Sequence, residues 1–412
     1  MPELDFGKLL ICRSILQNTT IQAFAEALAE PSDDNLHAKA VSCLVSEAER
    51  LGLKGNILRN YLIHRLAHDV NIAAETSEIS NGKIGTSLYQ AFVQDMGILL
   101  PIFCKLPSHF LRTHLLDHYE PTVEGNRENS VWLRSILAEA VQPEDIADGF
   151  LQYYHRYGYG DIASYCAFRW DHDADRIVGI HYFEALTLND IIGYERQKKQ
   201  LIENTEAFLA GKPANNALLI GARGTGKSSS VKALAREYYG KGLRLLQLTK
   251  AQLGELPSIM EHLRKFASKR FIIFLDDLSF EEFETEYKYL KSAIEGGVES
   301  RPENVLIYAT SNRRHLIKET WQERRDDLSE LYRNDSMNEM ISLSDRFGLV
   351  ITFIAPDQEQ YLAIIAHYLQ KENICLAPEE LRILGHRWEI EHSGRSGRTA
   401  QQFVNYYLGQ KK

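Results

Sequence analysis

Apolar residues in the first part of the chain recur at intervals of three and four, the spacing of one face of an α-helix. One run joins Ile21, Phe24 and Leu28, and a longer one joins Leu36, Ala40, Leu44, Ala48 and Leu51. Gly52 directly follows the longer run, as expected for a residue that ends a helix. Because helical spacing continues to about residue 165, we expect residues 1–170 to form an all-helical N-terminal module.

The second part of the chain alternates short apolar runs with helical ones. A β-like run from Arg176 to Tyr182 marks the junction. The later strand-like runs are Ala217–Ile220, Leu243–Leu248, Phe271–Leu275, Val305–Ala309 and Val350–Phe353. Alternation of this kind predicts an α/β fold, a parallel sheet covered by helices with ligands at the carboxyl ends of the strands. We expect this sheet domain over residues 171–355 and a helical C-terminal lid over residues 356–412.

Composition narrows the class of protein. The length of 412 residues fits two or three domains, and the apolar share of 44% is that of an ordinary soluble protein. A net charge of -9 gives no overall footprint for nucleic acid, although a local basic face could lie within it. The five scattered cysteines indicate free thiols in a reducing cytosol and no zinc site. Met96–Cys104, the most apolar stretch, contains Pro101 and is too short to span a bilayer, so we expect a cytoplasmic protein without a membrane span.

A phosphate-binding loop is the strongest chemical signal. Residues 221–228 read Gly-Ala-Arg-Gly-Thr-Gly-Lys-Ser and satisfy the pattern G-x-x-x-x-G-K-[ST] between a strand-like and a helix-like run. The glycines would turn backbone N–H groups toward a phosphate chain at the positive end of a helix. Lys227 would reach the β- and γ-phosphates, and the Ser228 hydroxyl would ligate Mg²⁺. The expected contacts with a nucleoside triphosphate are Gly221, Ala222, Arg223, Gly224, Thr225, Gly226, Lys227, Ser228 and Ser229. The alternative is a glycine-rich turn without a ligand.

Two further strands end in polar residues. The run Phe271–Leu275 leads into Asp276, which we expect to hold Mg²⁺, and Asp277, which we expect to polarise an attacking water. The next strand leads into Asn312, whose amide could hydrogen-bond both the γ-phosphate and that water. Against these roles stand an exposed acidic strand end and an ordinary turn. A third feature, the tyrosines of residues 153–159, could stack nucleic-acid bases or pack against a core edge.

The order of these motifs resembles that of the AAA+ ATPases over about residues 184–408. The resemblance adds Ile192-Gly193 before the loop, Ser344–Gly348 after the strands, and Gly394–Arg398 in the lid. The strings NTEAFLAGKPANNALLIGARGTGKSS, FLDDLSFEE and YATSNRRHL look more closely like the bacterial AAA+ family named domain of unknown function 815. Membership would imply the fold and the ATPase class, with ATP and Mg²⁺ as cofactors, but no substrate.

The resemblance also implies roles for single residues. Ile192 and Gly193 would lie beside the adenine. Arg346 would be an arginine finger that reaches the γ-phosphate of a neighbouring subunit, which makes a homo-oligomer the expected assembly. Arg398, with Arg395 as the competing choice, would let the lid sense that phosphate. The alternatives are that Arg346 pairs with a nearby acid and that Arg398 is a surface residue.

Two departures from the family pattern bear on function. Asp277 stands where most of the superfamily has glutamate, and its shorter reach suits slow turnover and a switch. Leu253-Gly254-Glu255-Leu256 offers no aromatic residue where polypeptide-threading ATPases place a pore loop. We therefore expect an ATPase that remodels or switches a partner chosen by the N-terminal module. The alternatives are a nucleotide-gated scaffold with little hydrolysis, and a nucleic-acid remodeller or helicase loader, which the charge does not support.

Overall fold

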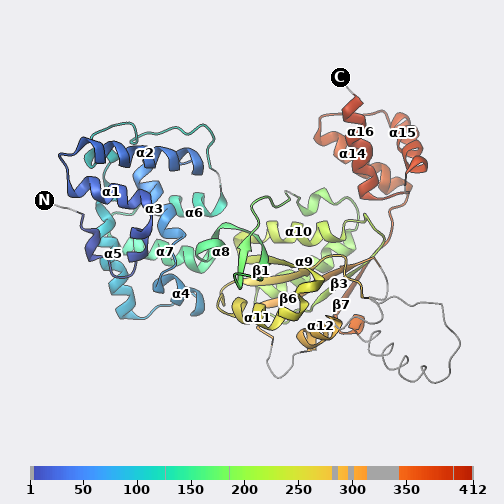
Figure 1. Ribbon diagram of the computed structural model, residues 1–412. Helices are drawn as coiled ribbons and strands as arrows, with labels where there is room; N and C mark the ends of the chain where they lie inside the picture. Colours follow the sequence, from blue (N-terminus) through green and yellow to red (C-terminus); the bar gives the residue numbers. More distant parts are fainter. Residues whose placement is uncertain are drawn as a thin grey trace. The chain divides into compact units, whose positions relative to one another are not determined.

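Figure 1 shows the computed structural model, which describes residues 4–125, 127–184, 186–280, 286–295, 301–312, 343–392 and 394–410. The chain packs as two compact units. The helical unit contains Met1–Tyr165 together with the separate segment Lys265–Lys269. The sheet unit contains Cys166–Arg264 and Arg270–Lys412. A short segment of later sequence therefore folds with the N-terminal helices.

The helical unit is built from helices, as the periodicity predicts. Its α-helices are α1 (Thr19–Ala29), α2 (Asp34–Leu51), α3 (Ile57–Ala67), α4 (Ile72–Ile79), α5 (Thr86–Cys104), α6 (Glu128–Ile136), α7 (Pro143–Tyr157) and α8 (Gly160–Ser164). The Asp33 carboxylate caps the start of α2, and Gly52 ends that helix with a left-handed φ of 66°. A Cβ on Gly52 would lie 2.2 Å from the backbone nitrogen of Gly125, so the close approach of these two segments requires glycine.

The tyrosine cluster is part of the core of the helical unit. Tyr153, Tyr154 and Tyr157, all on α7, are at most 1% exposed. The hydroxyl of Tyr154 donates to the carbonyl of Leu66 at 2.8 Å, and the Asn129 side chain donates to the Tyr153 oxygen at 3.0 Å. Buried tyrosines need such partners for their hydroxyls. Core packing is therefore confirmed for these three rings, and a base-stacking platform built on them is wrong because their faces are not accessible.

Helix α5 is the one helix of the described ranges that is long and apolar enough to cross a membrane, judged by length and composition alone. Pro101 lies inside it, and Phe92 and Met96 are fully buried in the helical unit. Asp95 is also fully buried, and its carboxylate accepts hydrogen bonds from the backbone N–H groups of residues 10–12 at 2.7 to 2.9 Å. These contacts are those of a core helix.

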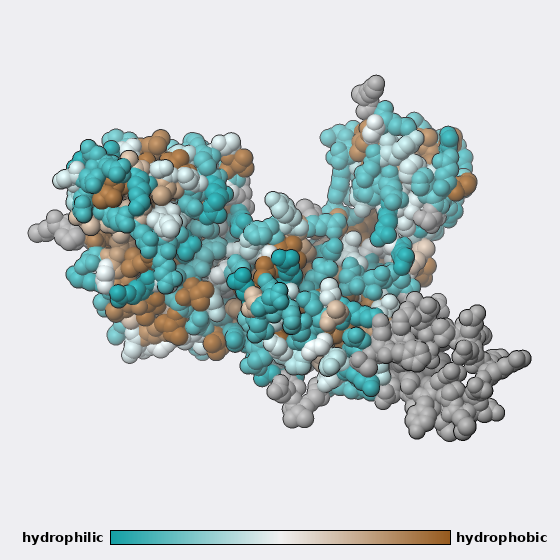
Figure 2. All heavy atoms as spheres, viewed as in Figure 1, coloured by the Kyte–Doolittle hydropathy of each residue, from teal (hydrophilic) through white to brown (hydrophobic). Residues whose placement is uncertain are grey.

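The surface of the helical unit includes exposed apolar side chains at α4. Val70, Ile72 and Ile79 are each more than half exposed. Figure 2 shows brown, hydrophobic atoms in this part of the unit, while much of the remaining visible face is teal and hydrophilic. Isolated apolar residues are common on protein surfaces. These three, in contrast, come from one short helix and the chain just before it.

The segment Lys265–Lys269 is held in the helical unit by a buried ion pair. The Lys269 ammonium lies 3.1 Å from the Glu78 carboxylate, and both side chains are 0% exposed. The ammonium also donates to the carbonyl of His155 at 2.6 Å, and the Ser268 hydroxyl donates to Glu78 at 2.8 Å. Buried charges are tolerated when hydrogen bonds complete their coordination in this way.

The sheet unit is built on a seven-stranded sheet in the order β2-β1-β4-β5-β6-β3-β7. The strands are β1 (Ala167–Asp171), β2 (Arg176–Gly179), β3 (Ala217–Gly221), β4 (Leu243–Leu248), β5 (Arg270–Leu275), β6 (Val305–Ser311) and β7 (Leu349–Phe353). All neighbouring pairs are parallel except β1 and β2. Strand β3 lies between β6 and β7, so the carboxyl ends of β3, β5 and β6 meet at one edge of the sheet.

Strands β1 and β2 form an antiparallel hairpin that departs from the predicted parallel sheet. The expected domain boundary at residue 170 lies inside β1, and β2 ends at Gly179, not at Tyr182, which is fully exposed. Strand β1 is five residues long, too short to give a clear alternating pattern. The turn contains Asp175 in a left-handed conformation, φ 45°, which aspartate tolerates better than most residues.

Helices complete the sheet unit. The sheet is accompanied by α9 (Glu195–Leu209), α10 (Lys227–Glu237), α11 (Leu256–Arg264) and α12 (Glu286–Glu295). The lid consists of α14 (Gln358–Lys371), α15 (Pro378–Glu391) and α16 (Gly397–Gln410), red in Figure 1. The lid has its own apolar core, in which Tyr361 and Ile365 of α14 and Phe403 of α16 are buried. The prediction of a helical C-terminal region is confirmed.

Candidate nucleotide-binding site

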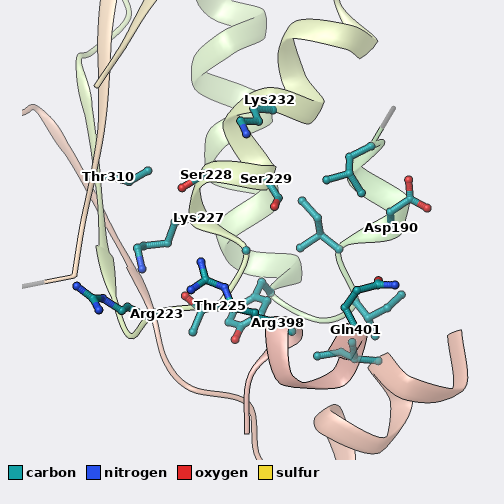
Figure 3. A pocket seen from close by; sticks show the side chains of 18 of the residues that line it. Asp190, Arg223, Thr225, Lys227, Ser228, Ser229, Lys232, Thr310, Arg398 and Gln401 are labelled. Atoms are coloured by element: carbon teal, nitrogen blue, oxygen red, sulfur yellow. The ribbon is translucent and has the colours of Figure 1, made fainter. Parts of the chain in front are cut away.

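A cavity of about 810 Å³ lies at the carboxyl edge of the sheet (Figure 3). Its size falls within the range of small-molecule sites in proteins, about 300 to 1,000 Å³. The predicted site residues that line it are Ile192, Arg223, Gly224, Thr225, Gly226, Lys227, Ser228, Ser229, Asp276, Asp277, Asn312 and Arg398. Gly193, Gly221, Ala222 and Arg346 are not among the lining residues. Segments more than two hundred residues apart thus meet around one space.

The loop between β3 and α10 takes its shape from its glycines. Gly221, Gly224 and Gly226 have φ angles of 144°, 72° and 87°, which L-residues adopt at a cost in strain. At Gly221 an added Cβ would lie 1.9 Å from the carbonyl oxygen of Phe353 on β7. The loop can therefore leave the sheet edge and turn into the N-terminus of α10 only with glycine at these points.

Lys227, the first residue of α10, points back across the loop. Its ammonium donates to the carbonyl oxygens of Gly221 at 2.8 Å and Ala222 at 2.6 Å, and to the side-chain oxygen of Asn312 at 3.1 Å. Burial lowers the pKa of Lys227, and the carboxylates of Asp277 and Asp276 act in the opposite direction. The group is a cation enclosed by acceptors from the loop and from the strand β6.

The ends of β5 and β6 are joined by hydrogen bonds around the two acids. The carboxylate of Asp276 accepts from the Ser228 hydroxyl at 2.5 Å and from the Thr310 hydroxyl at 2.7 Å. The backbone N–H of Asp277 donates to the same Thr310 oxygen at 2.9 Å, and the Asn312 amide donates to the Asp277 carboxylate. Thr310 therefore fixes the position of both acids.

Oxygen donors converge here, although no group of three or more His, Cys, Asp or Glu side chains suited to a metal occurs in the described ranges. Ser228 and Asp276 present one hydroxyl and one carboxylate within 2.5 Å of each other. Magnesium prefers hard oxygen ligands and is commonly held by one or two protein groups together with phosphate oxygens and water. The residues present fit that ion and do not fit a cage made by protein alone.

The lid reaches the loop through the start of α16. The backbone N–H of Gly397 donates to the carbonyl of Gly224 at 2.8 Å, and Arg398 lines the cavity. Arg395, the competing choice, forms an ion pair with Glu389 within the lid at 2.7 Å and is not among the lining residues. The structure thus brings the Arg398 side chain to the cavity and directs Arg395 elsewhere.

Other residues of the cavity were missed by sequence reasoning. Asp190, on the 3-10 helix Leu188–Asp190, lines the cavity and pairs with Lys371 of α14. Hydrogen bonds from Lys371 and Thr187 outweigh burial and lower the pKa of Asp190 to about 2. Tyr368 and Gln401, one from each of two lid helices, also line the space. Gln401 lies three residues after Arg398 on α16, a spacing that could have indicated a shared helix face.

Arg346 lies away from the cavity and forms an ion pair with Glu295 of α12. Arg346 therefore pairs with an acid of its own chain, as the alternative interpretation predicted. A role as an arginine finger would require the site of a neighbouring subunit. The segment in the pore-loop position folds as the 3-10 helix Lys250–Glu255, with Leu253 fully buried and Leu256 1% exposed at the start of α11. These leucines contribute to the core of the sheet unit.

The family model described as "Protein of unknown function (DUF815)" matches residues 163–411, more than half of the chain. The chain belongs to the DUF815 family. The match covers the whole sheet unit except its last residue, and within that unit the order of the strands, the loop and the helical lid confirm the AAA+ ATPase fold expected from the motifs. The match gives the DUF815 protein no substrate.

The similarity to known proteins covers only part of the chain. The replication factor C large subunit of Staphylothermus marinus is 30% identical over 110 residues, 25% of each chain. The replication factor C small subunit of Natronomonas pharaonis is 29% identical over 116 residues, 26% of this chain and 34% of the relative. The Thermotoga maritima RuvB Holliday junction branch migration motor is a structural neighbour with 16% identity and a TM-score of 0.38, covering 54% of this chain and 64% of RuvB. This DUF815 protein thus spans about a quarter to a third of the length of the two curated relatives.

Proposed function

We propose that this protein binds ATP together with Mg²⁺ in the cavity and hydrolyses it, so that its nucleotide state switches or remodels a partner. The observation that carries the proposal is the convergence on one cavity of five residues that follow three strands, with the lid also reaching that cavity. These residues are Lys227, Ser228, Asp276, Asp277 and Asn312. A phosphate-binding loop by itself would support only binding. The adjacent acids and amide add the groups that hydrolysis requires.

Phosphate oxygens would bind Lys227 by replacing acceptors to which its ammonium now donates. The Lys227 ammonium now donates to loop carbonyls and Asn312, and phosphate oxygens would replace some of these acceptors. The amides of the glycine loop and the N-terminus of α10 would face the phosphate chain. Burial lowers the pKa of Lys227 and so disfavours its protonated form, and the negative charge of a phosphate would act against this and favour the ammonium.

Ser228 and Asp276 would hold Mg²⁺, which would neutralise part of the phosphate charge. Asp276 is kept in place by Thr310, so its carboxylate is oriented before any ligand arrives. Asp277, held by the Asn312 amide, would accept a hydrogen bond from the attacking water and orient it toward the γ-phosphate. Asn312 would then exchange its present bonds for the phosphate and the water.

Nucleotide state would reach the rest of the molecule through the lid. Gly397 bonds to the loop at Gly224, and Arg398 lines the cavity, so a γ-phosphate would attract the start of α16. Arg346 would act on the site of a neighbouring copy in a homo-oligomer, and the helical unit would select the partner. Slow hydrolysis in a nucleotide-gated scaffold is the alternative that the shorter side chain of Asp277 favours.

Calorimetry with Lys227→Ala tests the proposal. The variant should lose nearly all affinity for ATP in the presence of Mg²⁺, because the only buried cation among the described lining residues is removed. Lys199→Ala, on the exposed face of α9, is the matched control and should bind like the parent chain. Retained ATP affinity in Lys227→Ala would refute the assignment. Turnover measured with and without cell extract separates a stimulated enzyme from a scaffold, which would show no stimulation.

A nucleic-acid client is the second candidate, favoured by the similarity to replication factor C subunits. The net charge of -9 weighs against it. Fluorescence anisotropy with single- and double-stranded DNA, with and without ATP, distinguishes the two clients. Binding that requires ATP and weakens with salt would support a nucleic-acid client, and absent binding would leave a protein partner.

A further inference from the structure

A second cavity, of about 250 Å³, lies wholly within the helical unit and plays no part in the proposed ATPase. The end of α2, helix α3, the segment 123–127 and helix α6 surround it. Part of its wall is apolar, because Leu53, Ile63 and Leu133 line it and are at most 8% exposed. This volume lies just below the range of about 300 to 1,000 Å³ for small-molecule sites, so the space suits a ligand much smaller than a nucleoside triphosphate.

Two arginines face this cavity without a matching acid. The Arg134 guanidinium donates to the backbone carbonyls of Ser130 and Gly125, both at 3.3 Å, and Arg127 lies over the ring of Tyr165 at 5.8 Å. Within the part of the chain that the structure describes, neither arginine has a carboxylate within ion-pair distance. Arg127 is exposed and Arg134 is partly buried, so both guanidiniums are accessible to a ligand. An anion bound between them would gain charge-assisted hydrogen bonds.

The acidic residues at the cavity are already engaged elsewhere. Glu49 accepts hydrogen bonds from the Tyr119 hydroxyl at 2.6 Å and from the Thr122 N–H at 3.0 Å. Glu124 lies 3.7 Å from the ammonium of Lys54. These acids therefore have their own donors and do not neutralise the two arginines.

A pair of histidines adds a neutral donor. The ring of His68 is fixed at both nitrogens, by the carbonyl of His64 at 2.7 Å and the hydroxyl of Ser164 at 2.5 Å. The ring of His64, whose centre lies 4.1 Å from that of His68, has no hydrogen bond to the described residues. Burial, followed by the His68 ring and nearby arginines including Arg127, lowers the pKa of His64 to about 2. His64 is thus a neutral imidazole with an N–H free for a ligand.

We propose that this cavity binds a small organic anion, whose carboxylate or phosphate group lies between Arg127 and Arg134 and accepts a hydrogen bond from His64. The body of the ligand packs against the apolar wall near Leu53 and Leu133. Small-molecule sites combine an apolar wall, here Leu53, Ile63 and Leu133, with polar groups that orient the ligand. The arginines supply planar paired donors, which suit both kinds of oxyanion.

Calorimetry with two probes, phenyl phosphate and benzoate, tests the proposal and distinguishes the two head groups. The full-length protein carries Lys227→Ala, so that phosphate binding at the glycine loop does not contribute. We expect at least one probe to bind with a Kd below 1 mM and both Arg127→Gln and Arg134→Gln to weaken it at least tenfold. Arg112→Gln, an exposed arginine of the same unit paired with Asp34, is the matched control and should leave the Kd unchanged.

Conservative variants protect the test against loss of folding. Arg134 also donates hydrogen bonds to the backbone, so its replacement could disturb the fold. Circular dichroism therefore first establishes that each variant is folded. If Arg134→Gln does not fold, the result for Arg127→Gln decides the test. Arg127→Lys keeps the charge and should retain part of the affinity that Arg127→Gln loses. Absence of binding by both probes, or equal weakening in Arg112→Gln, would overturn the proposal.

Discussion

Asp277 combines an unusual backbone conformation with the proposed role of orienting the attacking water. Its φ of 53° is left-handed, a conformation that costs about 1 kcal/mol or more for most side chains. The bond from its N–H to Thr310 and the bond from Asn312 to its carboxylate hold it there. Strain of this kind is retained where the surrounding structure fixes a group for a purpose, here orientation of the carboxylate toward the cavity.

Replacing this carboxylate should separate binding from hydrolysis. We expect Asp277→Asn to keep ATP affinity within about threefold, because the phosphate ligands remain, and to lose about 10² to 10⁴ in turnover, the contribution of a positioned base. Phosphate release measures the rate and calorimetry the affinity. Asp277→Glu should hydrolyse at least as fast as the parent chain because of its longer reach. Equal turnover in Asp277→Asn and the parent would exclude a role in hydrolysis.

The buried pair of Lys269 and Glu78 is expected to determine the stability of the helical unit. Lys269→Met leaves an unpaired carboxylate in the core, which should cost about 3 to 5 kcal/mol in the free energy of unfolding. Adding Glu78→Gln removes that charge and should restore much of the loss. Lys39→Met breaks the exposed pair with Glu26 and should leave the free energy of unfolding nearly unchanged, because water and salt screen exposed charges. Urea unfolding, followed by circular dichroism, measures the free energy of unfolding of each variant. If the destabilisation of the double variant equalled the sum of those of the two single variants, Lys269 and Glu78 would not be coupled.

At the scale of elements, the lid helix α14 is joined to the 3-10 helix Leu188–Asp190 by the Asp190 and Lys371 ion pair, with His367 3.7 Å from the same carboxylate. Gly397 makes a second link to the glycine loop. Both links lie beside the cavity, so the lid is held by contacts that a bound nucleotide would adjoin.

The stability contributed by the Asp190 and Lys371 ion pair should fall at acidic pH. The pKa of Asp190 is lowered to about 2 in the folded protein, below the ordinary value of about 4. Its ionised form therefore stabilises the fold above about pH 4, and the stabilisation is lost as pH falls toward 2. The stability difference between the parent chain and Asp190→Asn, from thermal unfolding, should shrink over that range. A constant difference from pH 6 to pH 2 would show that Asp190 carries no such linkage.

At the scale of the whole molecule, one copy of the chain supplies a complete cavity but not the predicted finger. Arg346 is paired with Glu295 on its own chain, so any action on phosphate requires a second copy to approach that edge. Besides the link at Tyr165, the chain passes between the helical unit and the sheet unit at both ends of Lys265–Lys269. After Lys269 it enters the sheet unit at β5. The strand β5 begins directly after Lys269 and leads into Asp276 and Asp277, so one strand connects this segment to the cavity.

Mixing variants tests the shared site. Arg346→Ala should bind ATP normally and lose about 10³-fold or more in turnover, the effect of an arginine supplied in trans. Mixed with Lys227→Ala, it should recover part of the activity, because a hybrid interface joins an intact loop to an intact arginine. Phosphate release across mixing ratios measures this. Parallel loss of ATP affinity, or the absence of any recovery, would assign Arg346 to the fold through Glu295.

Local features of the fold could be predicted from the residue pattern alone. The glycine loop, the strands β3 to β7, the acids after β5 and the helical periods of α1 and α2 were predictable because their patterns repeat over a few residues and reflect backbone geometry. The lid was predictable as helices, and the family motifs indicated Arg398 as a candidate.

The meeting of groups far apart in the sequence depends on how whole elements pack in three dimensions. Asp190 and Tyr368 reach the cavity, Lys269 enters the helical unit to meet Glu78, and Arg395 turns away to Glu389. Local spacing predicts neither the short strand β1 nor the meeting of Arg127 and Arg134 at one cavity. Such contacts depend on the packing of whole elements, in which residues far apart in sequence lose water together, and periodicity within one element carries no record of its partner.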